Sequence, residues 1–295
     1  MVADAHDTQM QEEFSRNCGL ISIQEQRTLF ETRVAVAGAG GVGGVHILNL
    51  ARLGIGKFTI ADPDTFEAVN VNRQYGASQS TLGRNKAQVL AEMVRDINPE
   101  ADVRIFAEGV SVANIDAFLD DADIFIDGID FFEIGIRRLL FRKSREKGIY
   151  ALTAAPLGFG ATLQVFSPKG MGFDAYFGIT DRMEELEKIA AFASGLAPRP
   201  YHLKYLDLSK VSLARKTGPA VSPACTLAAS LIATEVVKIL TGKGKVRPVP
   251  SYTQIDLMRG KFKQGYVWMG GRNPIQCLMR RIILKKAKDA AASGE

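Results

Sequence analysis

The stretch VAVAGAGGVGG at residues 34–44 limits the fold more than any other part of the sequence. Its alternating Val and Ala residues are typical of a buried strand, and the glycines that follow allow a tight turn. Apolar residues resume directly after the glycines, as expected for the start of a helix. The first N–H groups of such a helix, and its partial positive charge, face the turn. The segment is therefore suited to hold a phosphate group.

The first half of the chain continues this alternation of strands and helices. We expect strands at residues 33–37, 57–61, 103–107, 123–127 and 150–153, with helices at 43–53, 84–97, 112–119 and 131–147 between them. Strands that alternate with helices imply right-handed crossovers and a mostly parallel sheet. The predicted fold class is α/β, a Rossmann-like, doubly wound sheet that binds its ligand at the carboxyl ends of the strands.

The second half follows a different pattern. Residues 160–166 predict an edge strand that returns antiparallel, and residues 168–219 are irregular except for a helix expected at 182–193. A buried helix at 223–240, a hairpin of strands at 252–257 and 262–267, and an amphipathic helix at 274–287 complete the prediction.

The predicted elements suggest one main domain with a C-terminal addition. We expect the main domain at residues 1–245, with an N-terminal helical arm at 8–31 and a crossover region at 168–222. Residues 246–295 are expected to form the hairpin and a basic amphipathic helix, so that antiparallel strands join the sheet in the C-terminal half.

Cysteine content and apolar patterning exclude several classes of protein. The three cysteines, Cys18, Cys225 and Cys277, are an odd number at wide spacing, which fits neither a disulfide framework nor a zinc site. We therefore expect a cytoplasmic protein without structural zinc. The polar N-terminus lacks the apolar core of a signal peptide, and the apolar stretch at 224–240 is too short and too charged for a membrane span.

The formal net charge of +5 is unevenly distributed, with an excess in RRIILKKAK at residues 280–288. A basic run of this kind can bind nucleic acid, but it is more often one solvated face of a helix. Nucleic acid therefore stays open as a partner, and no membrane partner is expected.

The glycine-rich turn contains the pattern Gly38-x-Gly40-Gly41-x-Gly43. Asp62 ends the second predicted strand, 19 residues after Gly43, at the position where an acidic side chain receives ribose hydroxyls. A structural turn and a turn-forming aspartate are the simpler alternatives. The two features together fit NAD, FAD or ATP equally well.

The segment between Asp62 and the next helix favours ATP. It runs for more than twenty residues with little periodicity, whereas such loops usually have about 2–6 residues, and long ones are usually functional. It carries Asn70 and Arg73, and Lys86 follows at the helix start. A guanidinium and an ammonium added to a glycine loop match a triphosphate better than a diphosphate.

Asp130 lies just past the fourth predicted strand, three residues after Asp127. A carboxylate at the carboxyl end of a strand, close to phosphates, suits Mg²⁺. An aspartate before an apolar run is also a common helix start, so the sequence leaves both interpretations open.

These features together resemble the ThiF/MoeB/HesA family, the bacterial relatives of ubiquitin-activating enzymes. The resemblance covers residues 14–240 and rests on ordered elements: GxGGxG, the strand-end Asp62, NVNRQ at 70–74, G-x-x-K at 83–86 and the strand-end Asp130. PLGFG at 156–160 and the late helix VSPACTLAASLIATEVVKILTG at 221–242 add to it.

The resemblance implies an adenylyltransferase that uses ATP and Mg²⁺. The family activates a carboxylate, commonly the C-terminal glycine of a ubiquitin-like protein, by attack on the α-phosphate with release of pyrophosphate. The implied substrate is a ubiquitin-like or sulfur-carrier protein, or a peptide. A tRNA-linked group is a further possibility, which the basic tail mildly favours.

The resemblance also assigns roles to residues. Asp62 would bind the ribose, and Asn70, Arg73 and Lys86 would hold the phosphates above the four glycines. Asp130 would hold Mg²⁺. Arg16 stands where the family places an arginine that crosses from a partner subunit, which implies a homodimer with two shared sites. The residues expected to carry catalysis are Arg16, Arg73, Lys86 and Asp130.

The sequence departs from the family at three points. It lacks the two C-x-x-C pairs that often bind zinc, and residues 167–223 lack the cysteine that forms a thioester in many members. Cys225 lies just beyond as a candidate nucleophile, with a buried structural cysteine as the alternative. Phe131 follows Asp130 where the family usually has Asn.

Two other functions stay under consideration. One is a Rossmann oxidoreductase that uses NAD, which the long cationic loop disfavours. The three histidines, His6, His46 and His202, also offer no convincing acid–base catalyst. The other is a non-catalytic dimeric partner that binds nucleotide without turnover.

Overall fold

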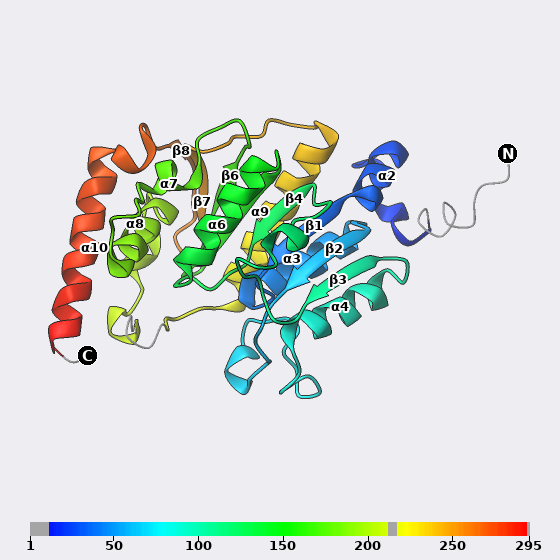
Figure 1. Cartoon of the computed structure of the whole chain (residues 1–295), viewed down its shortest axis with the longest axis horizontal. Helices are drawn as coiled ribbons and strands as arrows, with labels where there is room; N and C mark the ends of the chain where they lie inside the picture. Colours follow the sequence, from blue (N-terminus) through cyan, green and yellow to red (C-terminus); the bar gives the residue numbers. More distant parts are fainter. Residues whose placement is uncertain (1–11, 212–216, 294–295) are drawn as a thin grey trace.

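One eight-stranded sheet runs through the computed structural model, which describes residues 12–211 and 217–293. The strand order is β3-β2-β1-β4-β5-β6-β7-β8 (Figure 1). The first four residues of the predicted arm, 8–11, lie outside the described residues. The rest of the arm contains a 3₁₀ turn, η1 (Ser15–Asn17), and helix α2 (Ile23–Glu31), whose start is fixed by a capping box at Ser22.

The parallel half of the sheet contains the five predicted strands. Its strands are β1 (Arg33–Ala37), β2 (Lys57–Ala61), β3 (Asp102–Phe106), β4 (Ile124–Asp127) and β5 (Tyr150–Leu157). The connecting helices are α3 (Gly41–Arg52), α4 (Lys86–Ile97), α5 (Ile115–Phe118) and α6 (Ile134–Glu146). Strand β5 runs four residues further than predicted, and α5 is shorter than predicted. Ala37 pairs with Ala61 on one side and with Asp127 on the other, so these strands end at one edge. The predicted Rossmann-like fold is confirmed.

The antiparallel half of the sheet differs from the prediction at one strand. Its strands are β6 (Gly160–Phe166), β7 (Ser251–Asp256) and β8 (Lys261–Tyr266). The prediction that β6 is an edge strand is wrong, because β7 pairs with its free side, Gly160 opposite Asp256. Strand β8 is the edge strand on this side of the sheet. The sequence could not show this, since the hairpin returns to the sheet after more than eighty intervening residues.

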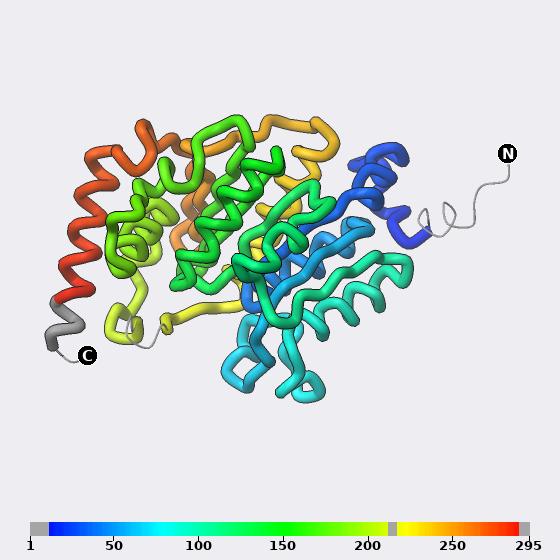
Figure 2. The backbone as a smooth tube through the Cα atoms, in the orientation of Figure 1, coloured from blue at the N-terminus to red at the C-terminus, as the bar shows by residue number. Residues whose placement is uncertain are grey.

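The segment between β6 and the late helix is more helical than predicted. It contains α7 (Phe173–Phe177), α8 (Glu185–Leu196) and two 3₁₀ turns, η3 (Tyr201–Lys204) and η4 (Leu208–Lys210). Helix α7 has a single turn, which is too short to show helical periodicity in the sequence. Helix α9 (Ser222–Thr241) follows, and a last 3₁₀ turn, η5 (Gly270–Arg272), leads into α10 (Pro274–Ser293). Figure 2 shows α10 and the N-terminal arm at opposite ends of the long axis.

Helices cover both faces of the sheet, and β1 shows why. Val34 and Val36 belong to a core cluster with side chains of α3, α4 and α9. Ala35 and Ala37 point to the other face and belong to a second cluster with side chains of α5, α6, α7 and α8. This alternation has the two-residue period of a strand that is buried on both faces.

Among the described residues, one helix, α9 with its 20 residues, is long and apolar enough to cross a membrane. This judgement rests on length and composition alone. The expectation that this stretch is too short is therefore wrong, because the helix extends beyond its most apolar part. In this fold α9 packs on β5, β6 and α3, so its apolar side chains contribute to the core.

Candidate nucleotide-binding site

The glycine loop packs directly on the end of β4. Gly38 has a φ of +89°, and a Cβ there would lie 2.1 Å from the carbonyl oxygen of Gly128. A Cβ at Gly43 would lie 1.8 Å from the carbonyl oxygen of Gly38. Neither position therefore has room for a side chain. Helix α3 begins at Gly41, two residues before the predicted start, with Gly40 as its N-cap residue.

Asp62 closes the loop from the end of β2. Its Oδ2 accepts the N–H of Ala39 at 2.6 Å, and its Oδ1 accepts the N–H of Asp64 at 2.9 Å. Burial raises the pKa of Asp62, while these two N–H groups and the charge of Lys86 act in the opposite direction. The structure therefore places Asp62 at the loop, as predicted, and shows that it fixes the loop's backbone. Its contact with a ribose stays a prediction.

Lys86 is the first residue of α4 and reaches the same edge of the sheet. Its Nζ lies 3.0 Å from Oδ2 of Asp64. The lysine side chain is 9% exposed, and the aspartate is 67% exposed. The preceding Asn85 donates to the carbonyl oxygens of Asp62 at 3.0 Å and Ala107 at 3.2 Å, which fixes the start of α4 against the ends of β2 and β3. Because Lys86 is paired with the solvated carboxylate of Asp64, its ammonium group can also bind a phosphate.

The long segment between β2 and α4 is ordered, although its sequence has little periodicity. Phe66 N–H donates to the carbonyl oxygen of Arg84 at 3.0 Å, and Gly83 N–H donates to that of Phe66 at 2.8 Å. These bonds close the base of the loop, and the buried Phe66 ring anchors it. Figure 1 shows the loop as the cyan segment beyond the carboxyl edge of the strands.

Arg73 lies beside the start of α3. Its Cγ is 3.7 Å and its Nε 3.8 Å from the position that a Cβ of Gly41 would take. Its Nη1 donates to Oδ1 of Asn72 at 3.0 Å and to the carbonyl oxygen of Val69 at 3.1 Å. The predicted juxtaposition of a guanidinium and the glycine loop is therefore present.

Gln74 also touches the loop, and the predicted site set did not include it. Its Nε2 lies 3.5 Å from the position of a Cβ at Gly40, and its buried Oε1 has no hydrogen-bond partner among the described residues. Buried polar atoms are nearly always paired, so this oxygen is a candidate ligand contact. Its signal in the sequence was its place at the end of the NVNRQ motif, directly after Arg73.

Asn70 has a different position from the two cations. It is 8% exposed, and its Oδ1 accepts the N–H of Glu67 at 3.0 Å within the turn η2 (Ala68–Asn70). The structure thus shows Asn70 shaping the loop, and its predicted phosphate contact stays a prediction.

Asp130 is exposed in the loop between β4 and α6. Its Oδ1 accepts the N–H of Phe132 at 2.9 Å, and α6 begins only at Ile134, with Glu133 as N-cap. Asp130 therefore does not cap α6, and the predicted helix start at Phe131 is three residues early. The metal role stays a prediction, and no group of three or more His, Cys, Asp or Glu able to hold a metal occurs among the described residues.

Arg137 organises the loop that carries Asp130. Its Nε lies 2.8 Å from Oδ2 of Asp127, and both side chains are at most 3% exposed. Its Nη2 donates to the carbonyl oxygens of Ile129 at 2.5 Å and Asp130 at 2.9 Å, and its guanidinium lies 4.6 Å from the ring centre of Phe192. Asp127 is thus engaged in a buried ion pair.

The fold of one chain does not bring Arg16 to the glycine loop. Arg16 is exposed in η1, and the next residue, Asn17, donates to the carbonyl oxygen of Leu53 at 3.3 Å, just past the end of α3. The glycine loop lies at the other end of this helix of 12 residues, about 18 Å away. Within one chain, the two groups are therefore separated by the length of α3.

Cys225 lies under the loop, with its Sγ 3.4 Å from the position of a Cβ at Gly41. It is 1% exposed, and burial raises its pKa to about 11, with Arg73 acting in the opposite direction. At neutral pH this group is a buried thiol, which favours the structural interpretation over the nucleophile.

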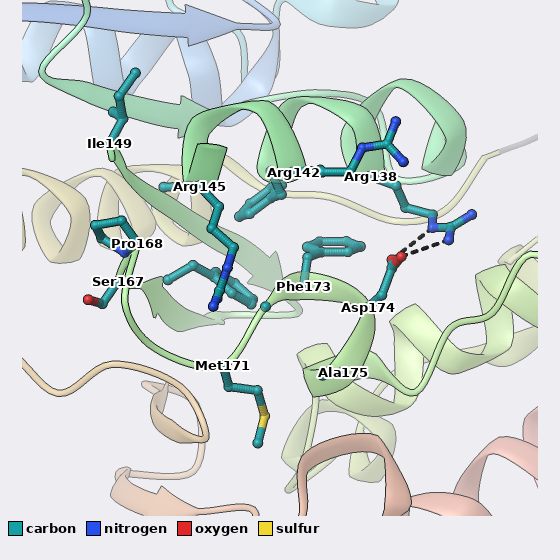
Figure 3. A pocket seen from close by; sticks show the side chains of 14 residues that line it. Arg138, Arg142, Arg145, Ile149, Ser167, Pro168, Met171, Phe173, Asp174 and Ala175 are labelled. Atoms are coloured by element: carbon teal, nitrogen blue, oxygen red, sulfur yellow. Dashed lines mark hydrogen bonds and ion pairs between the residues drawn. The ribbon is translucent and has the colours of Figure 1, made fainter. Parts of the chain in front are cut away.

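A separate cavity of ≈ 280 Å³ lies between α6 and α7 (Figure 3). Arg138, at one side of this cavity, binds Asp174 through two hydrogen bonds of 2.8 and 2.7 Å. The cavity contains none of the predicted site residues. The glycine loop and its cations thus form a site at the carboxyl ends of the parallel strands, and this site is distinct from the cavity.

Comparisons with known proteins identify a family and a similar fold. The ThiF family model matches residues 14–267. The chain is 40% identical over 103 residues to the tRNA threonylcarbamoyladenosine dehydratase of Haemophilus influenzae. This alignment covers 35% of this chain and 40% of that protein. It is 31% identical over 152 residues to the SAMP-activating enzyme E1 of Haloferax volcanii, covering 52% of this chain and 56% of that protein. The chain thus spans about half the length of these relatives.

A solved structure of Escherichia coli MccB with ATP has a similar fold. The TM-score is 0.62 with 20% sequence identity, and the alignment covers 89% of this chain and 72% of that chain. At this identity the similarity concerns the fold, including the arrangement of the strands whose carboxyl ends form the site.

Proposed function

Because the chain belongs to the ThiF family, we propose that it adenylates a carboxylate with ATP. The observation that carries this proposal is the glycine loop, closed by the buried Asp62 and flanked by the cations Arg73 and Lys86. Arg73 beside the start of α3 and Lys86 at the start of α4 supply two positive charges, which match a triphosphate. The pyrophosphate of NAD would need less positive charge.

The residues fit ATP at several points. The glycines let the loop pack closely and turn into α3, whose first N–H groups can approach the phosphates. Gln74 offers a buried oxygen without a partner among the described residues. We assign the ribose to Asp62 and the phosphates to Asn70, Arg73 and Lys86. Asp130 would hold Mg²⁺, which offsets the negative charge of the phosphates when bound.

The reaction needs little proton transfer. The substrate carboxylate is already ionised at neutral pH, so its oxygen can attack the α-phosphorus without a general base. The bond between that phosphorus and the oxygen leading to the β-phosphate breaks, and pyrophosphate leaves with the bonding electrons. Positioning and neutralisation of charge by Arg73 and Lys86 would supply most of the acceleration.

The position of Arg16 supports a homodimer with shared sites. This arginine is exposed at the opposite end of α3 from its own glycine loop. We propose that it completes the site of a second copy. The alternative of a non-catalytic nucleotide-binding dimer would keep the same contacts but show no turnover.

The relatives suggest two classes of substrate. We propose the C-terminus of a ubiquitin-like or sulfur-carrier protein, or of a peptide, because one relative is named a SAMP-activating enzyme E1. A tRNA-linked carboxyl group is the second candidate, because another relative is named a tRNA threonylcarbamoyladenosine dehydratase. Cys225 is buried, so we propose that the adenylate passes to an acceptor outside this chain.

Calorimetry of nucleotide binding tests the proposal before the substrate is known. We expect ATP with Mg²⁺ to bind the wild type, and Lys86→Ala to weaken binding by about tenfold or more, since it removes a charged phosphate contact. Lys188→Ala, which removes a lysine paired with Glu185 on α8, is the matched control and should bind normally. Binding of NAD⁺ without a response to ATP would overturn the proposal and favour the oxidoreductase.

A further inference from the structure

Exposed apolar side chains are concentrated near the C-terminal end of the described chain. Of the nineteen large apolar residues that are exposed among the described residues, nine lie between Leu257 and Ile282. They include Phe262 and Tyr266 of β8 at 65% exposure each, and Trp268 at 63%. Three of the nine lie on α10, and the other six lie on β8 and the turns beside it. Exposed apolar side chains that are contiguous mark an interaction surface, whereas single ones need no explanation.

Strand β8 is one of the two edge strands of the sheet, opposite β3. Val267 N–H, directly after β8, donates to the carbonyl oxygen of Pro250 at 2.8 Å, and Gly265 pairs with Tyr252 in the same register. Backbone groups on an antiparallel strand point alternately to either side. The backbone N–H and C=O groups of Phe262, Gln264 and Tyr266 therefore point away from β7, and such an edge can pair with another strand.

The side chains of the same three residues share one face of the sheet. Phe262 lies opposite Ile255, and Tyr266 lies opposite Ser251. Ile255 in turn pairs with Ala161, whose side chain belongs to the core cluster under α9. Helix α9 packs on β5 and β6, while Phe262 and Tyr266 farther out stay exposed.

We propose that β8 pairs antiparallel with β8 of a second copy of this chain, about a two-fold axis at Gln264. This register sets Phe262 opposite the partner's Tyr266 on both sides of the axis, and aromatic cross-strand pairs of this kind stabilise a sheet. On the other face it sets Lys263 opposite the partner's Gly265, so that no lysine faces a lysine. A register centred on Lys263 would oppose the two lysines directly.

Further exposed apolar residues flank β8 in the chain. Trp268 and Met269 follow the last paired residue, Tyr266, and the hairpin turn at 257–260 precedes β8. Leu257 and Met258 in that turn are 55% and 58% exposed. The proposed strand pair is self-complementary, as a two-fold interface requires, and these exposed residues lie just beyond its two ends.

This contact is separate from the one that would share Arg16. The N-terminal arm lies at one end of the long axis, and β8 lies towards the other end, where α10 is found (Figure 1). The inference therefore does not rest on the proposed adenylation. A chain that used both contacts would form an assembly larger than a dimer.

Disulfide trapping tests the register directly. Directly opposite Cα atoms in an antiparallel pair are about 4.5–5.5 Å apart, within the reach of a disulfide. We therefore expect Gln264→Cys, in a Cys18→Ser/Cys277→Ser background, to form a cross-linked dimer under mild oxidation. Lys263→Cys is the matched control, because the two residues 263 would be about 8 Å apart. Cross-linking at 264 no greater than at 263 would overturn the proposal.

Sedimentation analysis gives a second, independent readout. Gln264→Glu would place two carboxylates face to face at the two-fold axis, so the assembly should fall to half the mass of the wild type. Gln264→Thr is neutral and favours strands, so it should keep the wild-type mass. Both variants should bind ATP normally. An unchanged mass for Gln264→Glu would contradict the proposed interface.

Discussion

At the scale of single residues, the structure explains why Gly38 and Gly43 have no room for a side chain, which the sequence alone did not show. The motif predicted a tight turn, and the structure shows that the carbonyl oxygen of Gly128, from a strand 90 residues later, fills the space beside Gly38. Long-range contacts of this kind cannot be inferred from local spacing. The same holds for Gln74, whose buried oxygen is apparent only when the loop is folded.

The contact at Gly38 leads to a stability prediction. We expect Gly38→Ala to destabilise the protein by more than the roughly 1–2 kcal/mol that positive φ alone costs a residue with a Cβ, because its Cβ also meets backbone. Gly83→Ala is the matched control, because Gly83 has a similar φ of +81° and open space around its Cβ position. Urea unfolding of both variants measures the difference. Equal losses of stability would show that the loop relaxes away from Gly128.

His46 predicts how stability depends on pH. It is fully buried in α3, its two ring nitrogens have no hydrogen-bond partner among the described residues, and burial lowers its pKa to about 3 from 6.5. The unfolded chain therefore binds the proton more readily, and stability is lost as the pH falls from 6.5 towards 3. The slope from this group is at most about 1.4 kcal/mol per pH unit.

The substitution His46→Leu should remove this loss. As the pH is lowered from 7 to 5, wild type loses the contribution of His46 and the variant does not. We therefore expect the difference in free energy of unfolding, variant minus wild type, to increase by about 2 kcal/mol. Urea unfolding at both pH values measures the change. His202→Leu is the control, because His202 is only partly buried and Asp256 opposes the lowering of its pKa by burial. An unchanged acid limb in His46→Leu would assign the loss to other groups.

At the scale of elements, the loop between β4 and α6 depends on one ion pair. Arg137 holds Asp127 and the carbonyl oxygens of Ile129 and Asp130. We expect Arg137→Met to lose about 3–5 kcal/mol, because it leaves the buried Asp127 carboxylate without its partner. Hydrogen exchange should also rise in residues 129–133. Denaturant unfolding and exchange mass spectrometry measure these two effects.

The double variant Arg137→Met/Asp127→Leu separates the pair from the packing. It removes both charges, so it should be more stable than Arg137→Met alone, while exchange in residues 129–133 stays raised. A double variant less stable than the single one would show that the guanidinium acts through its carbonyl and aromatic contacts instead.

Most elements could be predicted because their patterns are local. Strands β1 and β2 have the predicted bounds, since short apolar runs end at glycine or at acidic residues. Helix ends were less accurate: α6 starts after Glu133, because the chain first makes a turn fixed by Asp130 and Arg137. The place of β6 inside the sheet depends on the distant hairpin, which spacing along the chain does not reveal.

At the scale of the whole molecule, the family resemblance and the structure meet at Arg16. The sequence predicted that this arginine acts with the glycine loop, and the fold places the two at opposite ends of α3. The prediction and the fold are compatible if the site is assembled from two chains. The molecule would then have one interface at the N-terminal arm and, by the register of β8, another at the far end of the sheet.

Mixing two inactive variants tests the shared site. If Arg16 of one chain completes the site of the other, Arg16→Ala and Lys86→Ala should each bind ATP weakly. After unfolding and refolding together in equal amounts, half of the dimers are mixed, and each mixed dimer regains one intact site. About a quarter of the sites should then bind ATP tightly. Calorimetric stoichiometry measures this fraction, and each variant refolded alone is the control. A mixture with no tight sites would place Arg16 outside the site of the partner.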